Sequence, residues 1–426
     1  MKVLIKSIFK QNFFRSSLLL VSTGIFGGIL GYIFQILMGR YLSVSDYAIF
    51  IALMAKLYVF AAPLSTINLL LTRKISSFKV DNEFNKIAYL FSTCNLYSLL
   101  IISFFFFAAF LFKDSLINFL KINSLTELII ILFIVFVSVF QSLSNSILQG
   151  FMSFKFYAFI GIVTVLLKIF LALLAVNLGY GLIGVLFSVF LASFFGYLIS
   201  LKQNLRLLPP LIQKQKFNFN SIFSSSWQVF LANIMFVYFS QIDILVVDYF
   251  FNNTDKSVFF VAAIIGKAAM YLPAGISTAI FPMTAEKNSK RESKFNIFLQ
   301  GLTLTAFLGF ASAIFFYFLS EEIIMFFYGI EYQESINILK FYGIAMIPIS
   351  LIHVIEHFLI ATGKVLFVYL LLLIAPLQLV LISHYHSSFL EILIAVYSSL
   401  SIVAIVGIIM VFINLSKKNE YKKSNI

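Results

Sequence analysis

Residues 18–38, LLLVSTGIFGGILGYIFQILM, decide the fold class of this chain. The stretch carries no charge, and about 20 apolar residues are enough for a helix to cross a bilayer. Similar blocks recur along all 426 residues, of which 61% are hydrophobic and 11% charged. Soluble domains are about 25% charged, and a membrane β-barrel would show short alternating segments instead. The sequence therefore predicts an all-α polytopic membrane protein.

Twelve apolar blocks predict twelve transmembrane helices. They lie at 17–38, 47–71, 87–112, 128–149, 157–177, 181–201, 221–246, 257–282, 295–319, 338–361, 365–383 and 390–413. The longest polar interruption separates the sixth block from the seventh. We therefore predict an N-terminal six-helix bundle over 1–201, a cytoplasmic linker over 202–220, and a C-terminal six-helix bundle over 221–426 that ends in a short basic cytoplasmic tail.

The placement of basic residues orients these helices. With the N-terminus placed inside, most of the 30 lysines and arginines fall in cytoplasmic segments. The predicted outside loops hold Arg40, Lys113, Lys121 and Lys256. Because cytoplasmic loops of membrane proteins carry the excess of Lys and Arg, both termini are predicted to be cytoplasmic. The net charge of +13 then reflects topology, and no nucleic-acid partner is expected.

An internal repeat relates the two predicted bundles. FIALMAKLYVFAAPLS (50–65) is similar to FVAAIIGKAAMYLPAG (260–275) in the second helix of each half. The phenylalanine, an alanine and the proline match at one constant offset, whereas the lysines Lys56 and Lys267 match with a one-residue slip. Six helices separate the two stretches, so both halves have the same orientation. The sequence thus predicts a pseudo-twofold axis along the membrane normal, as in transporters built from parallel repeats.

Several longer stretches resemble a known family. They are GRYLSVSDYAIF (39–50), LQGFMSFKFY (148–157), QIDILVVDYF (241–250), KAAMYLPAGISTAIFP (267–282) and FFYGIEYQESINILKFYGIAMIP (326–348). The chain resembles the multidrug/oligosaccharidyl-lipid/polysaccharide exporter superfamily, and within it the bacterial repeat-unit flippases for O-antigen and capsule. One departure is DKSVFFVAA (255–263), which lacks the glycine that this family usually has before a tyrosine.

The resemblance implies a flippase of polysaccharide biosynthesis. Such a protein moves a polyprenyl-pyrophosphate-linked oligosaccharide from the cytoplasmic to the outer leaflet of the bacterial inner membrane. It implies alternating access, coupling to H⁺ or Na⁺ and no other cofactor. It also implies a lipid-linked oligosaccharide as substrate, and a polysaccharide polymerase and other assembly proteins as partners. On this interpretation the chain is a transporter of capsule, O-antigen or other lipopolysaccharide units and not an enzyme.

Three lysines lie near the centres of predicted helices, where a charge is costly and usually faces a bundle interior or a cavity. They are Lys56, Lys168 and Lys267. We predict that they line a cationic substrate cavity, because lysine meets a pyrophosphate as a point charge. The alternative for each is a structural pair with an acid or a side chain that reaches the interface.

Acidic and histidine residues within the helices are candidates for ion coupling. Asp243 is predicted either to pair with Lys267 or to take part in coupling. HVIEH (353–357) supplies His353, Glu356 and His357. The trio fits a proton-sensitive cluster or a polar contact between helices. It also matches the inverted zinc-protease signature, but no clear third ligand accompanies it, and we expect no metal.

Gly24, Gly27 and Gly31 lie on the first predicted helix with the spacing of a small-residue contact motif. Such glycines usually allow two helices in a membrane to approach closely. We therefore expect them to pack against a neighbouring helix.

Four functions remain open from sequence alone. A flippase requires a cationic cavity and a groove for the polyprenyl tail. A multidrug or cation antiporter of the same superfamily requires an acidic cavity, against which the three central lysines argue. An intramembrane metalloprotease requires bound zinc, and a scaffold of a polysaccharide synthesis complex requires no transport.

Overall fold

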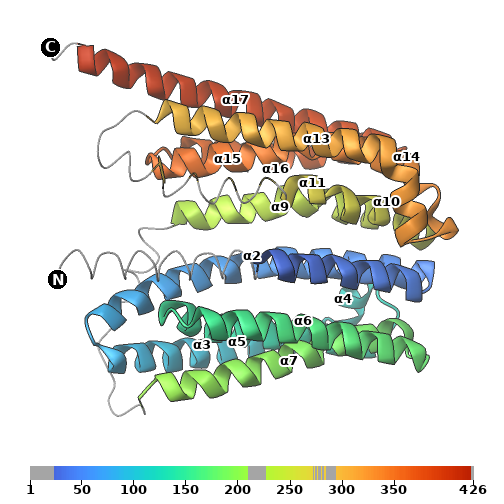
Figure 1. The fold of residues 1–426 in the computed structure, drawn as a ribbon. Helices are drawn as coiled ribbons and strands as arrows, with labels where there is room; N and C mark the ends of the chain where they lie inside the picture. Colours follow the sequence, from blue (N-terminus) through green and yellow to red (C-terminus); the bar gives the residue numbers. More distant parts are fainter. Residues whose placement is uncertain are drawn as a thin grey trace. The chain divides into compact units, whose positions relative to one another are not determined.

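A computed structural model describes residues 24–209, 227–271 and 294–423, together with 273, 276, 280, 283 and 284. Every regular element within these residues is a helix (Figure 1), which confirms the predicted all-α class. The chain divides into two compact units. The first combines Met1–Leu53 with Pro63–Ser226, and the second combines Met54–Ala62 with Trp227–Ile426.

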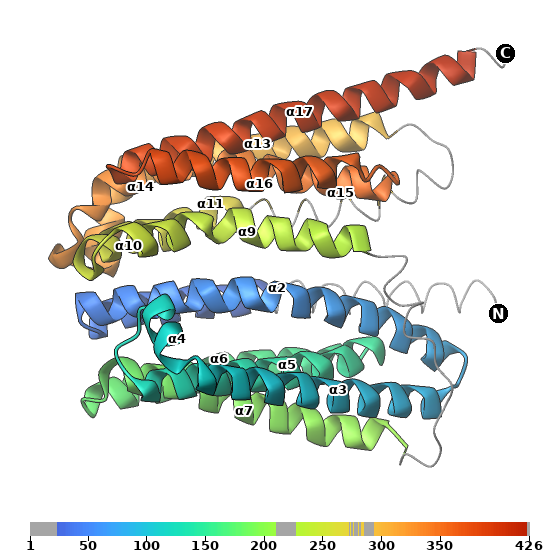
Figure 2. The ribbon, with the colours of Figure 1, turned by 180° about the vertical axis from the view of Figure 1, so that it is seen from behind.

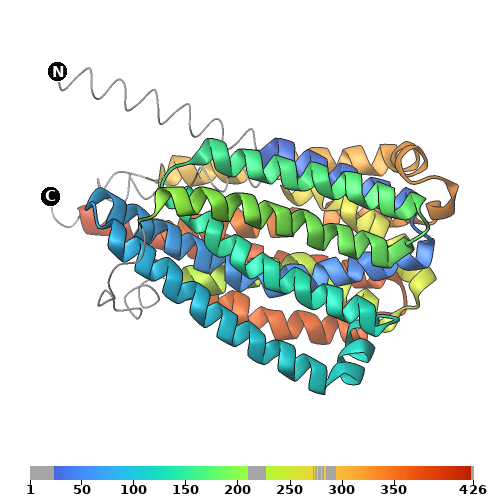
Figure 3. The same cartoon turned by 90° about the horizontal axis from the view of Figure 1, so that it is seen from below.

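The first unit begins with a helix over residues 24–41. It continues with α2 (Val44–Val80), α3 (Phe84–Leu111), α4 (Lys113–Leu120), α5 (Leu125–Gly150), α6 (Phe154–Asn177) and α7 (Gly181–Leu207). Helix α7 packs against both α5 and α6 (Figure 3). The short helix α4 turns away from the direction of α3 before the chain enters α5 (Figure 2). Ser43 and Ser124 cap α2 and α5, because each side chain accepts a hydrogen bond from a backbone N–H in the first turn.

The second unit comprises the middle of α2 and the helices after residue 226. These are α9 (Trp227–Phe250), α10 (Asn253–Gly266), α11 (Ala268–Tyr271), α13 (Phe295–Phe327), the 3-10 turn η1 (Ile330–Tyr332), α14 (Ser335–Ala345), α15 (Ile347–Ala361), α16 (Leu366–His384) and α17 (Phe389–Lys423). Helix α13 packs against α14 and α15, and α17 packs against α14, α15 and α16. Pro348 lies in the first turn of α15, where a missing N–H costs little.

Ten helices of the described residues are long and apolar enough to cross a membrane, if α14 and α15 are counted as one span over Ser335–Ala361. Each corresponds to one predicted span. The two other predicted spans, 17–38 and 257–282, extend beyond the described residues, and the helix over 24–41, α10 and α11 occupy their described parts. Helix α7 continues to Leu207, so the segment predicted as a linker over 202–220 begins as helix; its residues from 210 onward lie outside the described ranges.

Apolar side chains on the outside of the helices fit a lipid environment. Helix α3 shows this most clearly, since it exposes Phe104, Phe105, Phe107 and Phe110. Soluble proteins rarely expose so large an apolar surface to water. By contrast, Phe259, Phe260, Val261, Ala262 and Ala263 on α10 are all fully buried. A helix that is apolar on every face belongs in the interior, so the charges next to α10 are buried as well.

Candidate functional site: buried charges of the second unit

An interruption between helices α10 and α11 falls at Lys267 in the second unit. Helix α10 ends at Gly266, Lys267 caps it, and α11 starts at Ala268. The N–H of Lys267 donates to the carbonyl of Ala263 at 2.9 Å, whereas the Lys267 carbonyl accepts from the N–H groups of Met270 and Tyr271 at 3.0 and 3.2 Å. The backbone therefore remains hydrogen-bonded across the break while the lysine side chain points into the unit.

Lys267 forms a buried ion pair with Asp243 on α9. The Nζ–Oδ1 distance is 3.1 Å, and the two side chains are 5% and 1% exposed. The hydroxyl of Tyr342, on α14, donates to the other carboxylate oxygen, Oδ2. Lysine and tyrosine therefore satisfy both oxygens of the carboxylate. The pairing of Asp243 with Lys267 was one of the two predicted roles of this acid, and it makes this pair neutral overall.

Gly266 allows Tyr342 to reach Asp243. A Cβ added to this glycine would lie 2.3 Å from Cδ1 of the tyrosine ring. The ring therefore packs directly on the backbone at the end of α10. Position 266 therefore requires glycine, because the tyrosine ring leaves no room for a side chain there.

A second aspartate, Asp248, binds two lysines. Its Oδ2 lies 2.7 Å from Nζ of Lys56, and its Oδ1 lies 2.7 Å from Nζ of Lys256. Lys56 belongs to Met54–Ala62, the part of α2 that groups with the second unit. The side chains of Lys56, Lys256 and Asp248 are 10%, 1% and 4% exposed. Among the described residues, the ammonium groups of two lysines thus contact one carboxylate.

Lys256 is the residue of this cluster that sequence reasoning missed. It was assigned to an outside loop, but it lies in the first turn of α10, and only 1% of its side chain is exposed. The reason is the short connection after Phe250, which brings the end of α9 next to the start of α10. The spacing of Asp248 and Lys256 across a turn signal, Asn252-Asn253, was the available clue.

Lys168 belongs to the first unit and lies in α6. Its Nζ lies 4.1 Å from the ring centroid of Phe34, a cation–π contact. Within the residues that the structure describes, no carboxylate lies within ion-pair distance of it. Lys56 and Lys267 bind different aspartates of the second unit. A cavity lined jointly by Lys56, Lys168 and Lys267 therefore stays a prediction.

The HVIEH residues lie together on α15. Nδ1 of His357 is 2.9 Å from the carbonyl oxygen of His353, and the ring centroids of the two histidines are 4.3 Å apart. The His353 ring also stacks on Phe236 at 4.1 Å. Glu356 is buried, and its Oε2 has no hydrogen-bond partner among the described residues. Within those residues, no three His, Cys, Asp or Glu side chains are grouped to hold a metal ion.

We expect Tyr342→Phe to destabilise the protein by about 2 kcal/mol, because it removes a hydrogen bond to a buried carboxylate. The measurement is the free energy of unfolding in detergent micelles with increasing SDS. Tyr385→Phe is the control, since Tyr385 is exposed and its change is expected to cost under about 0.5 kcal/mol. Equal stabilities of the two variants would contradict a stabilising role of the Tyr342 hydroxyl.

Comparison with known proteins gives a family and a fold. The family model described as polysaccharide biosynthesis protein matches residues 37–337. A search of curated protein sequences found no match. Solved structures are similar over nearly the whole chain.

Two of these structures represent different functions. One is an inward-facing multidrug resistance MATE family transporter of the MOP superfamily, with a TM-score of 0.78 and 13% identity over 92% of this chain and 96% of that one. The other is the lipid II flippase MurJ in an inward closed conformation, with a TM-score of 0.66 and 20% identity over 94% of this chain and 87% of that one. The chain therefore has the fold of these two structures, which confirms the predicted fold class, and the family model agrees with the predicted resemblance to polysaccharide exporters.

Proposed function

Because the chain belongs to the polysaccharide biosynthesis protein family and has the fold of MOP superfamily transporters, we propose that it is a lipid-linked oligosaccharide flippase. It moves polyprenyl-pyrophosphate-linked repeat units from the cytoplasmic to the outer leaflet of the inner membrane, for capsule, O-antigen or other surface polysaccharide. Both termini are cytoplasmic, and a polysaccharide polymerase receives the exported unit. The lipid II flippase among the similar structures supports a lipid-linked substrate.

The observation that carries this proposal is the contact of two lysines, Lys56 and Lys256, with Asp248. Transfer of a pyrophosphate through a membrane requires cations that replace its hydration, and isolated charges there are costly. Lys56 and Lys256 share one carboxylate, so an anionic substrate oxygen would add a second negative charge beside the two ammonium groups. Lys56 is the more exposed of the two, and we assign it to the substrate.

Lys168 and Lys267 are proposed to complete the substrate path. Lys168 has a ring but no carboxylate as its partner among the described residues, so its charge is available to an anion. Lys267 exchanges its bond with Asp243 for a substrate oxygen during the transport cycle, and Tyr342 holds the carboxylate meanwhile.

Coupling to H⁺ or Na⁺ is proposed to involve Glu356 and its histidine neighbours. A buried carboxylate without a hydrogen-bond partner is unfavourable as an anion, and the described partners leave Oε2 of Glu356 unbound. Taking up a proton or a cation relieves this cost. His353 and His357 lie on the same helix, within one turn of Glu356, and Asp243 is a further candidate.

A multidrug or cation antiporter is the alternative, since a MATE transporter has the same fold. That function requires acidic side chains available to a cationic substrate. Both aspartates of α9 are already bound by lysines, which favours an anionic substrate. The inverted zinc-protease signature gains no support from the contacts of His353 and His357.

Lys56→Met is expected to lower export at least about tenfold, the equivalent of one lost charge-assisted contact of about 1.4 kcal/mol. Export is measured as surface polysaccharide in a deletion strain, normalised to the protein inserted. Lys256→Met is the matched control, because it removes the other lysine from the same carboxylate but lies fully enclosed. Equal export by the two variants would overturn the assignment of Lys56 to the substrate.

A further inference from the structure

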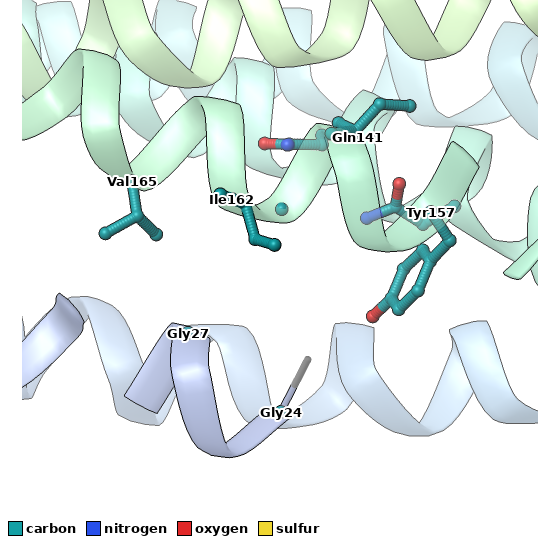
Figure 4. A pocket seen from close by; sticks show the side chains of 9 residues that line it. Gly24, Gly27, Gln141, Tyr157, Ile162 and Val165 are labelled. Atoms are coloured by element: carbon teal, nitrogen blue, oxygen red, sulfur yellow. The ribbon is translucent and has the colours of Figure 1, made fainter. Parts of the chain in front are cut away.

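A pocket opens within the first unit. It has a volume of about 400 Å³ and lies between the helix over residues 24–41 and helices α5 and α6. Its lining residues are Gly24, Gly27, Gln141, Asn145, Tyr157, Ile160, Gly161, Ile162 and Val165. In Figure 4, Tyr157, Ile162 and Val165 point from α6 toward the helix that carries Gly24 and Gly27. Ligand pockets are commonly of this size.

Glycines keep the pocket open. A Cβ added to Gly24, Gly27, Gly31 or Gly161 would meet no atom within 4 Å. The expectation that the glycines of the first helix allow close helix packing is therefore wrong for the described residues. Instead, Gly24, Gly27 and Gly161 leave free space on facing walls, and any larger side chain there would occupy it.

The polar groups of the described pocket lining are neutral. Gln141 and Asn145 contribute two amides from α5, and Tyr157 contributes a hydroxyl from α6. Oδ1 of Asn145 is buried and has no hydrogen-bond partner among the described residues. A buried acceptor left unsatisfied costs about 1–3 kcal/mol. A ligand that donates a hydrogen bond at this position would remove that cost.

The chemistry of the lining selects among ligand classes. An amide side chain both donates and accepts hydrogen bonds, as a sugar hydroxyl does. Among its described lining residues, the pocket holds no lysine or arginine for a phosphate and no aspartate or glutamate for a cation. Its apolar members, Ile160, Ile162 and Val165, suit the face of a pyranose ring that presents C–H groups. The described lining therefore matches an uncharged saccharide better than a pyrophosphate or a cationic drug.

We propose that this pocket binds a neutral sugar residue of the substrate, so that the first unit holds saccharide while cations elsewhere meet the pyrophosphate. The proposal rests on the proposed flippase function and specifies its substrate class. Lys168 lies one helical turn beyond Val165 on α6, and its contact with Phe34 places a cation further along the same pair of helices. A sugar in the pocket would thus have a positive charge nearby for the adjoining phosphate.

Photolabelling in lipid nanodiscs tests the pocket without requiring transport. The probe is a methyl glycoside of glucosamine whose N-acyl group carries a diazirine, and labelled peptides are identified by mass spectrometry. We expect label on α5 and α6 that an excess of the methyl glycoside of N-acetylglucosamine displaces. A quaternary ammonium and a simple alcohol, each bearing a diazirine, are expected to label these peptides at least about tenfold less.

Two neighbouring glycines supply a matched pair of variants. Gly27→Leu fills the pocket and is expected to reduce sugar labelling at least about tenfold. Gly28→Leu adds the same side chain at the next position, which has open space but does not line the pocket, and is expected to label as the unaltered protein does. Asn145→Leu, which removes the amide at similar volume, is expected to reduce labelling about tenfold.

The outcomes separate this inference from the proposed function. Equal sugar labelling of Gly27→Leu and Gly28→Leu would overturn the saccharide pocket, as would stronger labelling by the ammonium or the alcohol probe. The flippase function would survive either result if Lys56→Met still lost export. Conversely, displaceable sugar labelling in a protein that restores no polysaccharide to a deletion strain would support the pocket and overturn the flippase.

Discussion

Asp248→Asn is expected to lower the free energy of unfolding by about 3–5 kcal/mol, the cost of breaking a buried ion pair by removing one partner. The substitution keeps the shape of the side chain but removes the negative charge that the ammonium groups of Lys56 and Lys256 both contact at 2.7 Å. The ammonium groups of Lys56 and Lys256 would then repel each other in a buried site that has lost this carboxylate. The measurement is unfolding in detergent micelles with increasing SDS, followed by tryptophan and tyrosine fluorescence.

Asp255→Asn is the control for this prediction. Asp255 lies close by in sequence, in the first turn of α10, but it is exposed. Its carboxylate accepts a hydrogen bond from the capping residue Asn252, so its change is expected to cost about 1 kcal/mol or less. Adding Lys256→Met to Asp248→Asn removes one of the two cations and is expected to recover at least half of the loss. Stability unchanged by Asp248→Asn, or no recovery in the double variant, would show that the cluster is not held by charge.

Gly266→Val is expected to cost about 3–5 kcal/mol through two effects. A Cβ at this position lies 2.3 Å from the Tyr342 ring, and overpacking of a core costs about 1–3 kcal/mol. The ring cannot yield without withdrawing its hydroxyl from Asp243, which adds the loss of a hydrogen bond to a charged group, about 1.5–3 kcal/mol. Unfolding in SDS measures the sum.

A double-mutant cycle identifies the cause of this effect. In a Tyr342→Ala background the ring is absent, so Gly266→Val is expected to cost under about 1 kcal/mol more. Gly301→Ala is a second comparison, because the atom closest to its added Cβ is the terminal Cδ1 of Ile280, which moves easily. If Gly266→Val costs the same with and without Tyr342, the clash is not with the tyrosine.

The fold was largely predictable because its dominant signal is simple. Long apolar blocks need only exceed the bilayer thickness to be recognised as helices. Helix ends were less predictable, since hydropathy reports the hydrocarbon layer and not the end of the helix. Thus α2 continues to Val80 and α13 to Phe327, past the predicted ends at 71 and 319. The break at Lys267 precedes Pro273, and no sequence signal other than Gly266 marks it.

The charged residues were predictable as residues but not as pairs. A lysine inside an apolar helix stands out in any sequence, and Lys56, Lys168 and Lys267 were recognised that way. Which acid each one binds depends on helix packing that sequence spacing does not determine. The pocket around Asn145 was missed for a different reason. Its amides and glycines are ordinary residue types in a sequence, and only the fold brings them together around one pocket.

The ion pair between Lys56 and Asp248 can form only late in the synthesis of the protein. Helix α2 leaves the ribosome and enters the bilayer well before α9, which carries Asp248, has been made. In that interval the lysine bears its insertion cost of about 2.5–3.5 kcal/mol without this aspartate. The apolar residues of α2 must therefore hold the nascent helix in the membrane by themselves. In a chain truncated before α9, we expect α2 to be held in the membrane less firmly than in the full-length protein.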